Sequence, residues 1–160
     1  MNAPAALQFV TRGEAQTVEL GRKLAGVLRP GDVVALDGEL GAGKTRFVRG
    51  MAQGLGIAPD RTHSPTYVLA NVYEGAAGVR LVHVDAYRMA GAGDIEELGW
   101  DRLDDGASIV VVEWADRLGE ALAEPDRIIR VLIEHVGPEE RRISLRLPEG
   151  RELPGRHLDT

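Results

Sequence analysis

A glycine-rich segment in the first third of the chain has the residue types and spacing of a phosphate-binding loop. It reads Gly38-Glu39-Leu40-Gly41-Ala42-Gly43-Lys44-Thr45, which matches the pattern G-x-x-x-x-G-K-[ST]. Glycines let the backbone curl until several N–H groups face the same anion, and a following helix adds its positive end. Lys44 would then bridge the β- and γ-phosphates, and the Thr45 hydroxyl would bind Mg²⁺. The segment predicts a site for a nucleoside triphosphate, against the alternative of a plain glycine-rich turn.

Two carboxylates follow apolar runs and are candidates for the second metal ligand. Residues 79–84 run into Asp85, and the β-branched run 109–112 runs into Glu113. Parallel strands that flank a phosphate loop bring such residues to the end of the sheet where ligands bind. A carboxylate there holds Mg²⁺, usually through water. Either residue could instead be a surface carboxylate that terminates its strand.

Three further features carry weaker signals. A hydroxyl-bearing loop, Ser64-Pro65-Thr66-Tyr67, could sense the γ-phosphate as switch loops do, although an ordinary turn is the simpler interpretation. His83 lies inside an apolar strand, which favours a packed or hydrogen-bonded histidine over a catalytic one. Trp114 follows Glu113 and would pack either near the nucleotide or at the edge of the core.

The elements that must position these residues indicate one α/β domain. A strand at 33–36 precedes the loop, and a helix with Phe47, Met51 and Leu55 on one face follows it. The other predicted elements are an edge strand at 7–10, a helix that starts from a capping box of Thr11 and Glu14 and runs to about Leu28, strands at 67–73, 79–84, 109–112, 128–136 and 143–147, a short helix within 94–105 and a helix at 117–123. We expect a mixed central sheet with helices on both faces, as in P-loop NTPases. The predicted domain spans 1–147, followed by a loose tail at 148–160 that is rich in proline and glycine.

Composition excludes several classes of protein. The chain has 160 residues, no cysteine and a formal net charge of −6. Disulfides, thiolate metal sites and cysteine nucleophiles are therefore absent, and a broad electrostatic grip on nucleic acid is disfavoured. No apolar run approaches the roughly 20 residues of a membrane span, and no signal peptide is evident, so we expect a cytoplasmic protein. Lys23 and Lys44 are the only lysines beside 17 arginines, which draws attention to Lys44.

The motifs together resemble the TsaE (YjeE) family. The phosphate loop is shared by many NTPases, but its combination with Ser64-Pro65-Thr66-Tyr67, His83-Val84-Asp85-Ala86-Tyr87-Arg88 and Val112-Glu113-Trp114-Ala115-Asp116, in this order, is much more specific. The resemblance implies a weak ATPase that is stimulated by its partners, the TsaB and TsaD proteins. Its role would be to keep their complex turning over as it makes N6-threonylcarbamoyladenosine at position 37 of tRNA. Contact with tRNA would be indirect only.

The resemblance also implies roles for individual residues. ATP would lie on the loop from Gly38 to Thr45, with Thr11, Arg46 and Trp114 close by. Thr45 with Glu113 would hold Mg²⁺, and Asp85 would be the Walker-B-like acid at the metal site. Lys44, Asp85, Glu113 and Thr66 would carry the catalytic roles. Arg46 departs from the family, which often has a small hydroxyl residue there.

One alternative function remains open at this stage. A small P-loop kinase would use the same loop to phosphorylate a small molecule, although no arginine-rich lid is evident. A GTPase is disfavoured because the chain has no Asn-Lys-x-Asp segment to recognise guanine. The residues leave open which of Asp85 and Glu113 contacts Mg²⁺ directly, and which group orients the attacking water.

Overall fold

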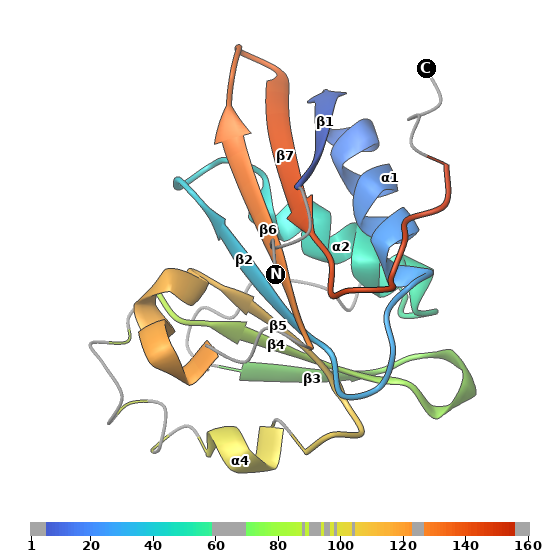
Figure 1. Cartoon of the computed structure of the whole chain (residues 1–160), viewed down its shortest axis with the longest axis vertical. Helices are drawn as coiled ribbons and strands as arrows, with labels where there is room; N and C mark the ends of the chain where they lie inside the picture. The colour runs from blue at the N-terminus through green and yellow to red at the C-terminus, as the bar shows by residue number, and fades with distance from the viewer. Residues whose placement is uncertain are drawn as a thin grey trace.

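A seven-stranded mixed sheet forms the centre of the molecule (Figure 1). The computed structural model describes residues 6–58, 70–87, 89, 94, 97, 99–103, 105–122 and 127–155. The strands are β1 (Leu7–Arg12), β2 (Val33–Gly38), β3 (Ala70–Glu74), β4 (Arg80–Asp85), β5 (Ile109–Glu113), β6 (Ile128–His135) and β7 (Glu140–Arg146), in the order β1-β7-β6-β2-β5-β4-β3. The pairs β2–β5, β2–β6 and β4–β5 are parallel, and the pairs at both edges are antiparallel. The predicted mixed α/β sheet, with 7–10 in an edge strand, is confirmed.

The first face of the sheet is covered by α1 (Glu14–Ala25) and α2 (Lys44–Gly54) (Figure 1). Leu20, Leu24, Phe47 and Met51 from these helices are buried against inward-facing residues of β2, β6 and β7. The two helices approach closely because glycines lie between them. A Cβ at Gly50 would lie 1.9 Å from the carbonyl oxygen of Val18. Glycine at position 50 therefore allows the backbones of the two helices to touch.

The second face is covered only in part. The 3₁₀ helix η3 (Ala115–Leu122) packs its Leu118 and Leu122 against β2, β4 and β5, and α4 (Trp100–Leu103) lies on the same side (Figure 1). Helices therefore lie on both faces, as predicted. In the described part of the chain no element covers this face over β6, β7 and β1, where every second side chain is at least partly exposed.

The predicted capping box at the start of α1 is wrong. The N-cap residue is Gly13, with φ 89° and no side-chain cap. Thr11 is still in β1, because antiparallel pairing with β7 continues as far as Arg12. Its hydroxyl instead lies 2.9 Å from that of Thr17. Glu14 instead forms an ion pair with Arg46 of α2.

Several element ends also differ from the predicted ones. α1 ends at Ala25 rather than Leu28. β7 begins at residue 140 rather than 143, because backbone pairing with both neighbours continues through polar residues. The predicted helix at 117–123 is the 3₁₀ helix η3, interrupted at Gly119 (φ 50°, ψ −123°). A short 3₁₀ helix, η2 (Ala76–Gly78), joins β3 to β4. Residues 67–69 of the strand predicted at 67–73 lie outside the described residues.

The segment after β7 is packed against the core as far as it is described. Leu153 is buried in the cluster beneath α1, and Arg151 forms an ion pair with Asp32. The boundary of the predicted single domain and the looseness of the last residues stay predictions. Within the described ranges no helix has both the length and the apolar character needed to cross a membrane.

Candidate functional site

The loop between β2 and α2 has the geometry of an anion site. Gly43 occupies the N-cap of α2 with φ 108°, a conformation that favours glycine, and no side chain caps the helix. The N–H groups of the first helical turn are thus not used by a cap and are available to an anion. Gly38 lies so close to β6 that a Cβ there would come within 2.6 Å of the Ile133 carbonyl oxygen. The loop therefore requires glycine at both of its ends.

Lys44 is held beneath this loop. Its ammonium donates to the carbonyl oxygen of Gly38 and, at 3.1 Å, to that of Glu39. It also lies 3.7 Å from the centre of the Trp114 ring. Burial lowers the pKa of Lys44, while the nearby carboxylates, Glu113 above all, act in the opposite direction. This cation is placed where it could exchange loop carbonyls for phosphate oxygens.

Asp85 and Glu113 lie side by side, as the sequence predicted for two strand ends. They are register partners at the ends of the parallel strands β4 and β5. Glu113 is buried, and its Oε2 lies 2.5 Å from Nε2 of the fully buried His83. An ionised Glu113 can only accept, so Nε2 donates. Asp85 accepts the backbone N–H of Tyr87 at 3.0 Å and is less buried.

His83 is hydrogen-bonded and packed, as the sequence analysis favoured. Its other ring nitrogen, Nδ1, is buried without a partner among the described residues. The ring therefore serves Glu113, whose carboxylate it orients from the core side. This is the arrangement in which an outer residue sets the direction of a possible metal ligand.

Trp114 adopts a conformation that is rare for its residue type. Its φ is 59°, and its N–H donates to the Leu36 carbonyl oxygen at 3.0 Å. Strained residues of this kind often lie at functional sites. Its ring packs between Lys44 and Tyr87, whose ring centre is 4.9 Å away. Trp114 thus lies beside the loop lysine.

The Asp37 carboxylate forms a hydrogen bond on the other side of the loop. Asp37, which directly precedes Gly38, accepts the backbone N–H of Asp116 at 3.0 Å. Burial raises the pKa of Asp37, and the negative charge of Asp116 acts in the same direction. The bond ties the start of η3, and with it Trp114, to the end of β2.

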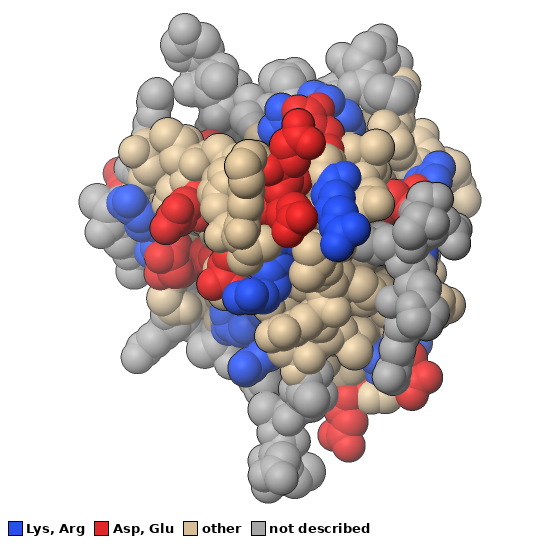
Figure 2. Space-filling view, turned by 90° about the horizontal axis from the view of Figure 1, so that it is seen from above, with Lys and Arg blue, Asp and Glu red and all other residues tan. Residues whose placement is uncertain are grey.

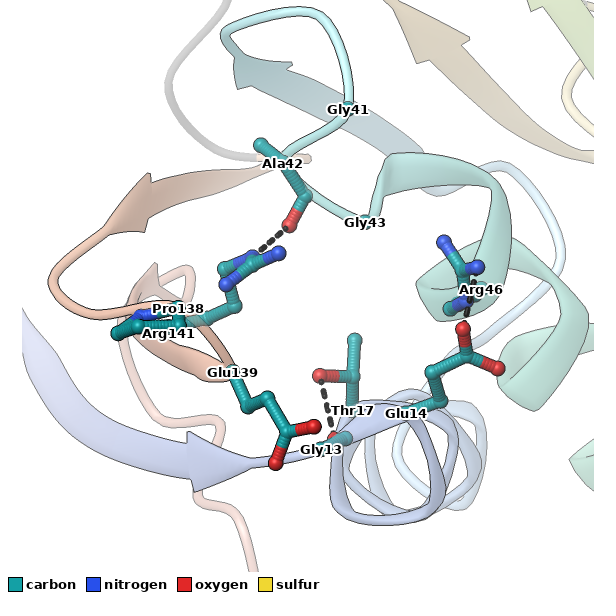
Figure 3. Close-up of a pocket in the computed structure, with 10 residues that line it drawn as sticks. All are labelled: Gly13, Glu14, Thr17, Gly41, Ala42, Gly43, Arg46, Pro138, Glu139 and Arg141. Carbon is teal, nitrogen blue, oxygen red and sulfur yellow. Dashed lines mark hydrogen bonds and ion pairs between the residues drawn. The ribbon is translucent and has the colours of Figure 1, made fainter.

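A pocket of about 470 Å³ opens beside the loop. Its walls come from the loop and α2, from the β1–α1 junction and from the β6–β7 turn; the lining residues are Gly13, Glu14, Thr17, Gly41, Ala42, Gly43, Arg46, Pro138, Glu139 and Arg141 (Figure 3). Arg141 donates from Nε to the Ala42 carbonyl oxygen at 2.9 Å. Arg46 pairs with Glu14 across the opposite wall, and this contact lowers the pKa of the Glu14 carboxyl.

The structure brings most of the predicted site residues together. The loop residues, Lys44, Asp85, Glu113 and Trp114 converge at one end of the sheet, and Arg46 lines the pocket. Thr11 is fully buried and does not line it, but its hydroxyl contacts Thr17, which does. Thr66 and its loop lie outside the described residues. Sequence reasoning placed Thr11 near the nucleotide but did not identify Gly13, Thr17 and Arg141 as residues that line the pocket.

The donor set fits Mg²⁺ with a bound triphosphate. In the described part of the chain no three acidic or histidine side chains gather as a ready metal site. Mg²⁺ commonly uses one or two protein oxygens and takes the rest of its shell from phosphates and water. Thr45 in the first turn of α2, with Glu113 and Asp85 at the adjacent strand ends, matches that requirement.

Charges of both signs are mixed over the end of the molecule that carries the β6–β7 turn. Figure 2 shows basic and acidic side chains next to one another there, with uncharged surface around them. No broad positive field covers the end shown, which agrees with the net charge of −6.

Comparisons with known proteins agree with these observations. Residues 11–143 match the family described as "Threonylcarbamoyl adenosine biosynthesis protein TsaE". A Streptomyces coelicolor protein named "tRNA threonylcarbamoyladenosine biosynthesis protein TsaE" is 49% identical over 116 residues, 71% of this chain and 76% of its own length. The Bacillus subtilis protein of the same name is 36% identical over 138 residues, covering 86% of this chain and 84% of that protein. The crystal structure of Bacillus subtilis YdiB superimposes with a TM-score of 0.73 at 32% identity, over 91% of this chain and 87% of that one.

Proposed function

The chain belongs to the TsaE family of tRNA threonylcarbamoyladenosine biosynthesis, and we propose that it serves this modification as a Mg²⁺-dependent ATPase acting on a TsaB–TsaD complex. The observation that carries the proposal is the position of Lys44. It lies under an uncapped helix start and near the strand-end carboxylates Glu113 and Asp85. A cation, free backbone N–H groups and metal-binding oxygens are what phosphoryl transfer needs in one place.

Each residue then has a role in ATP hydrolysis. Lys44 leaves the Gly38 and Glu39 carbonyls and binds the β- and γ-phosphate oxygens. The Thr45 hydroxyl and the Glu113 carboxylate would hold Mg²⁺, with Asp85 as the second acid. The ion, when bound, neutralises charge that develops on the phosphates. His83 keeps Glu113 in one orientation, so that the carboxylate need not reorganise when the nucleotide arrives.

The pocket beside the loop would receive the sugar and base of ATP. Arg46 and Arg141 contribute positive charge to its walls, and Thr11 supports one wall through Thr17. The loop with Thr66 would complete the site as a switch that senses the γ-phosphate.

The proposed partners are the TsaB and TsaD proteins, and tRNA would be met only through them. The net charge of −6 and the carboxylates Glu14 and Glu139 that line the pocket beside its arginines support a role that does not require a grip on RNA. We expect the reaction to take place in the cytoplasm. Hydrolysis would be weak with this chain alone, and the partner complex would raise it.

The two lysines of the chain provide a direct test. ATP hydrolysis is measured with and without Mg²⁺ and with and without purified TsaB–TsaD, for wild type, Lys44→Ala and Lys23→Ala. Lys44→Ala should lower the turnover rate at least 100-fold. This corresponds to a loss of ~2.7 kcal/mol of transition-state stabilisation, a modest amount for a cation that contacts the reacting phosphates. Lys23→Ala, on α1, should hydrolyse ATP like wild type. Equal rates with and without TsaB–TsaD would overturn the partner-coupled mechanism.

No observation in the structure favours the small-molecule kinase. Such an enzyme would consume ATP only when its acceptor is added, whereas the proposed ATPase transfers the phosphoryl group to water. The same assay distinguishes the two by the release of inorganic phosphate.

A further inference from the structure

The part of the second sheet face that no described residue covers is a continuous surface of three antiparallel strands. We call it the open face. Its outward side chains alternate with core residues along each strand; they are Gln8, Val10 and Arg12 of β1, Glu140, Arg142, Ser144 and Arg146 of β7, and Arg130, Leu132 and Glu134 of β6. The register places Val10 opposite Arg142, and Ser144 opposite Leu132.

The open face carries four arginines beside the carboxylates Glu134 and Glu140, and so has net positive charge on a chain with net negative charge. Its arginines are Arg12, Arg130, Arg142 and Arg146, and only Arg12 forms an ion pair with a carboxylate of the face, at 3.7 Å. In the described part of the chain no carboxylate lies within ion-pair distance of Arg142 or Arg146, although Glu134 is the register partner of Arg142.

Two of these arginines also form an unfavourable pair within the sheet. Arg130 and Arg146 are direct register partners on β6 and β7. Like charges in this relation destabilise a sheet. Arg130 partly relieves the repulsion by donating to the Leu122 carbonyl oxygen at 2.7 Å, whereas Arg146 extends from the exposed face. A ligand with negative charge would remove the remaining repulsion.

Apolar side chains lie among the arginines. Val10 is 50% exposed and Leu132 is 42% exposed. A shallow hollow of about 200 Å³ is lined by Leu132, Arg130, Arg146 and Asp37, among others. Exposed aliphatic groups with arginines around them are typical of protein interfaces, which are rich in arginine and apolar at the centre.

We propose that the open face is the surface with which this chain docks onto an acidic surface of its partner protein complex. The inference rests on the proposed function, since the partner is the TsaB–TsaD complex. Carboxylates of the partner pair with Arg142 and Arg146, and an apolar side chain packs on Val10 and Leu132. Because Asp37 lines the hollow and directly precedes Gly38, the docked partner reaches the start of the phosphate loop.

Other occupants fit the open face less well. Single-stranded RNA is bound by aromatic side chains on which bases stack, and none of the outward residues of the face is aromatic. A second copy would bring the same net positive charge to this face across a two-fold axis, because such an interface joins identical patches.

Charge reversal tests the proposal. Affinity for purified TsaB–TsaD is measured by biolayer interferometry for wild type, for Arg142→Glu with Arg146→Glu, and for Leu132→Asp. The matched control is Arg29→Glu with Arg102→Glu, which makes the same change in net charge at exposed positions elsewhere. The open-face variants should bind at least tenfold more weakly, the control should bind like wild type, and wild-type binding should weaken with added salt. Basal ATP hydrolysis should stay unchanged in the arginine variants, which also shows that they are folded.

The outcomes separate this inference from the function beneath it. Wild type that hydrolyses ATP but does not bind TsaB–TsaD would overturn both the partner and the docking surface. Wild type that binds, with open-face variants of equal affinity, would overturn the docking surface alone. If the reversed arginines instead abolish binding of tRNA, or convert a dimer to a monomer in light scattering, the face belongs to RNA or to a second copy and the proposal is wrong.

Discussion

Replacing Arg141 by alanine should weaken ATP binding although this residue is about 100 positions from the loop in sequence. Its Nε donates to the carbonyl oxygen of Ala42 at 2.9 Å, and its guanidinium also donates to the Glu140 carbonyl oxygen at 3.0 Å. The Ala42 carbonyl and the Gly43 N–H belong to one planar trans peptide and point in opposite directions. Holding the carbonyl therefore aims the N–H away from Arg141, into the loop.

The size of the effect follows from the bond. A hydrogen bond to a charged donor contributes about 1.5–3 kcal/mol. Part of that stabilises the free protein, so only the share that preorganises the loop appears in ATP affinity. We expect a loss of about 1.4 kcal/mol, which is a tenfold rise in Kd.

The assay is titration of ATP by calorimetry, with the adjacent Arg142→Ala as the matched control. Arg142 lies on the opposite face of the same strand, so ATP binding in that variant should equal wild type. Partner binding should follow the reverse pattern, lost in Arg142 variants and kept in Arg141→Ala. Wild-type ATP affinity in Arg141→Ala at an unchanged melting temperature would refute the reasoning.

Three other perturbations have signed outcomes. Asp37→Asn should raise the melting temperature at pH 7, because burial raises the pKa of Asp37 in the folded protein and the charged carboxylate is therefore destabilising. The gain should vanish as the pH falls below about 4, where Asp37 is protonated in the unfolded chain as well. An equal gain in melting temperature at pH 3 would contradict this. Gly50→Ala should lower the free energy of unfolding in urea by about 1–3 kcal/mol, because the added Cβ would lie 1.9 Å from the Val18 carbonyl oxygen. An unchanged midpoint of urea unfolding would show that α1 and α2 can move apart without cost. Burial lowers the pKa of Lys44, so this lysine should lose its proton, and its hold on ATP, at a lower pH than an ordinary lysine would. Calorimetry on wild type across pH 7–10 should therefore show ATP affinity falling as the pH rises. An ATP affinity that stays constant over that range would count against this reasoning.

The chemistry of the site could be predicted from local sequence where local sequence determines it. The loop from Gly38 to Thr45 requires glycine at fixed places, and apolar runs that end in Asp85 and Glu113 mark strand ends. Their side-by-side position followed from parallel pairing alone. His83 was also correctly interpreted, because a histidine within a buried run needs a hydrogen-bond partner.

The pocket could not be predicted, because its walls come from distant parts of the chain. Gly13 follows β1, and Arg141 lies in β7. Both come near the loop after β2 because the strand order is β1-β7-β6-β2, which no local pattern in the sequence indicates. The capping box failed for a related reason. Pairing with β7 held Thr11 in the sheet, so a long-range contact overrode a good local pattern.

The central claim is that ATP bound at this loop keeps the partner complex active on tRNA. Purified TsaB and TsaD are supplied with tRNA and the activated threonylcarbamoyl donor, and modified tRNA is counted over many turnovers with ATP and with either wild type or Lys44→Ala. We predict that wild type sustains multiple turnovers, whereas Lys44→Ala leaves the reaction near the level seen without this chain. Equal yields from wild type and Lys44→Ala would contradict the account.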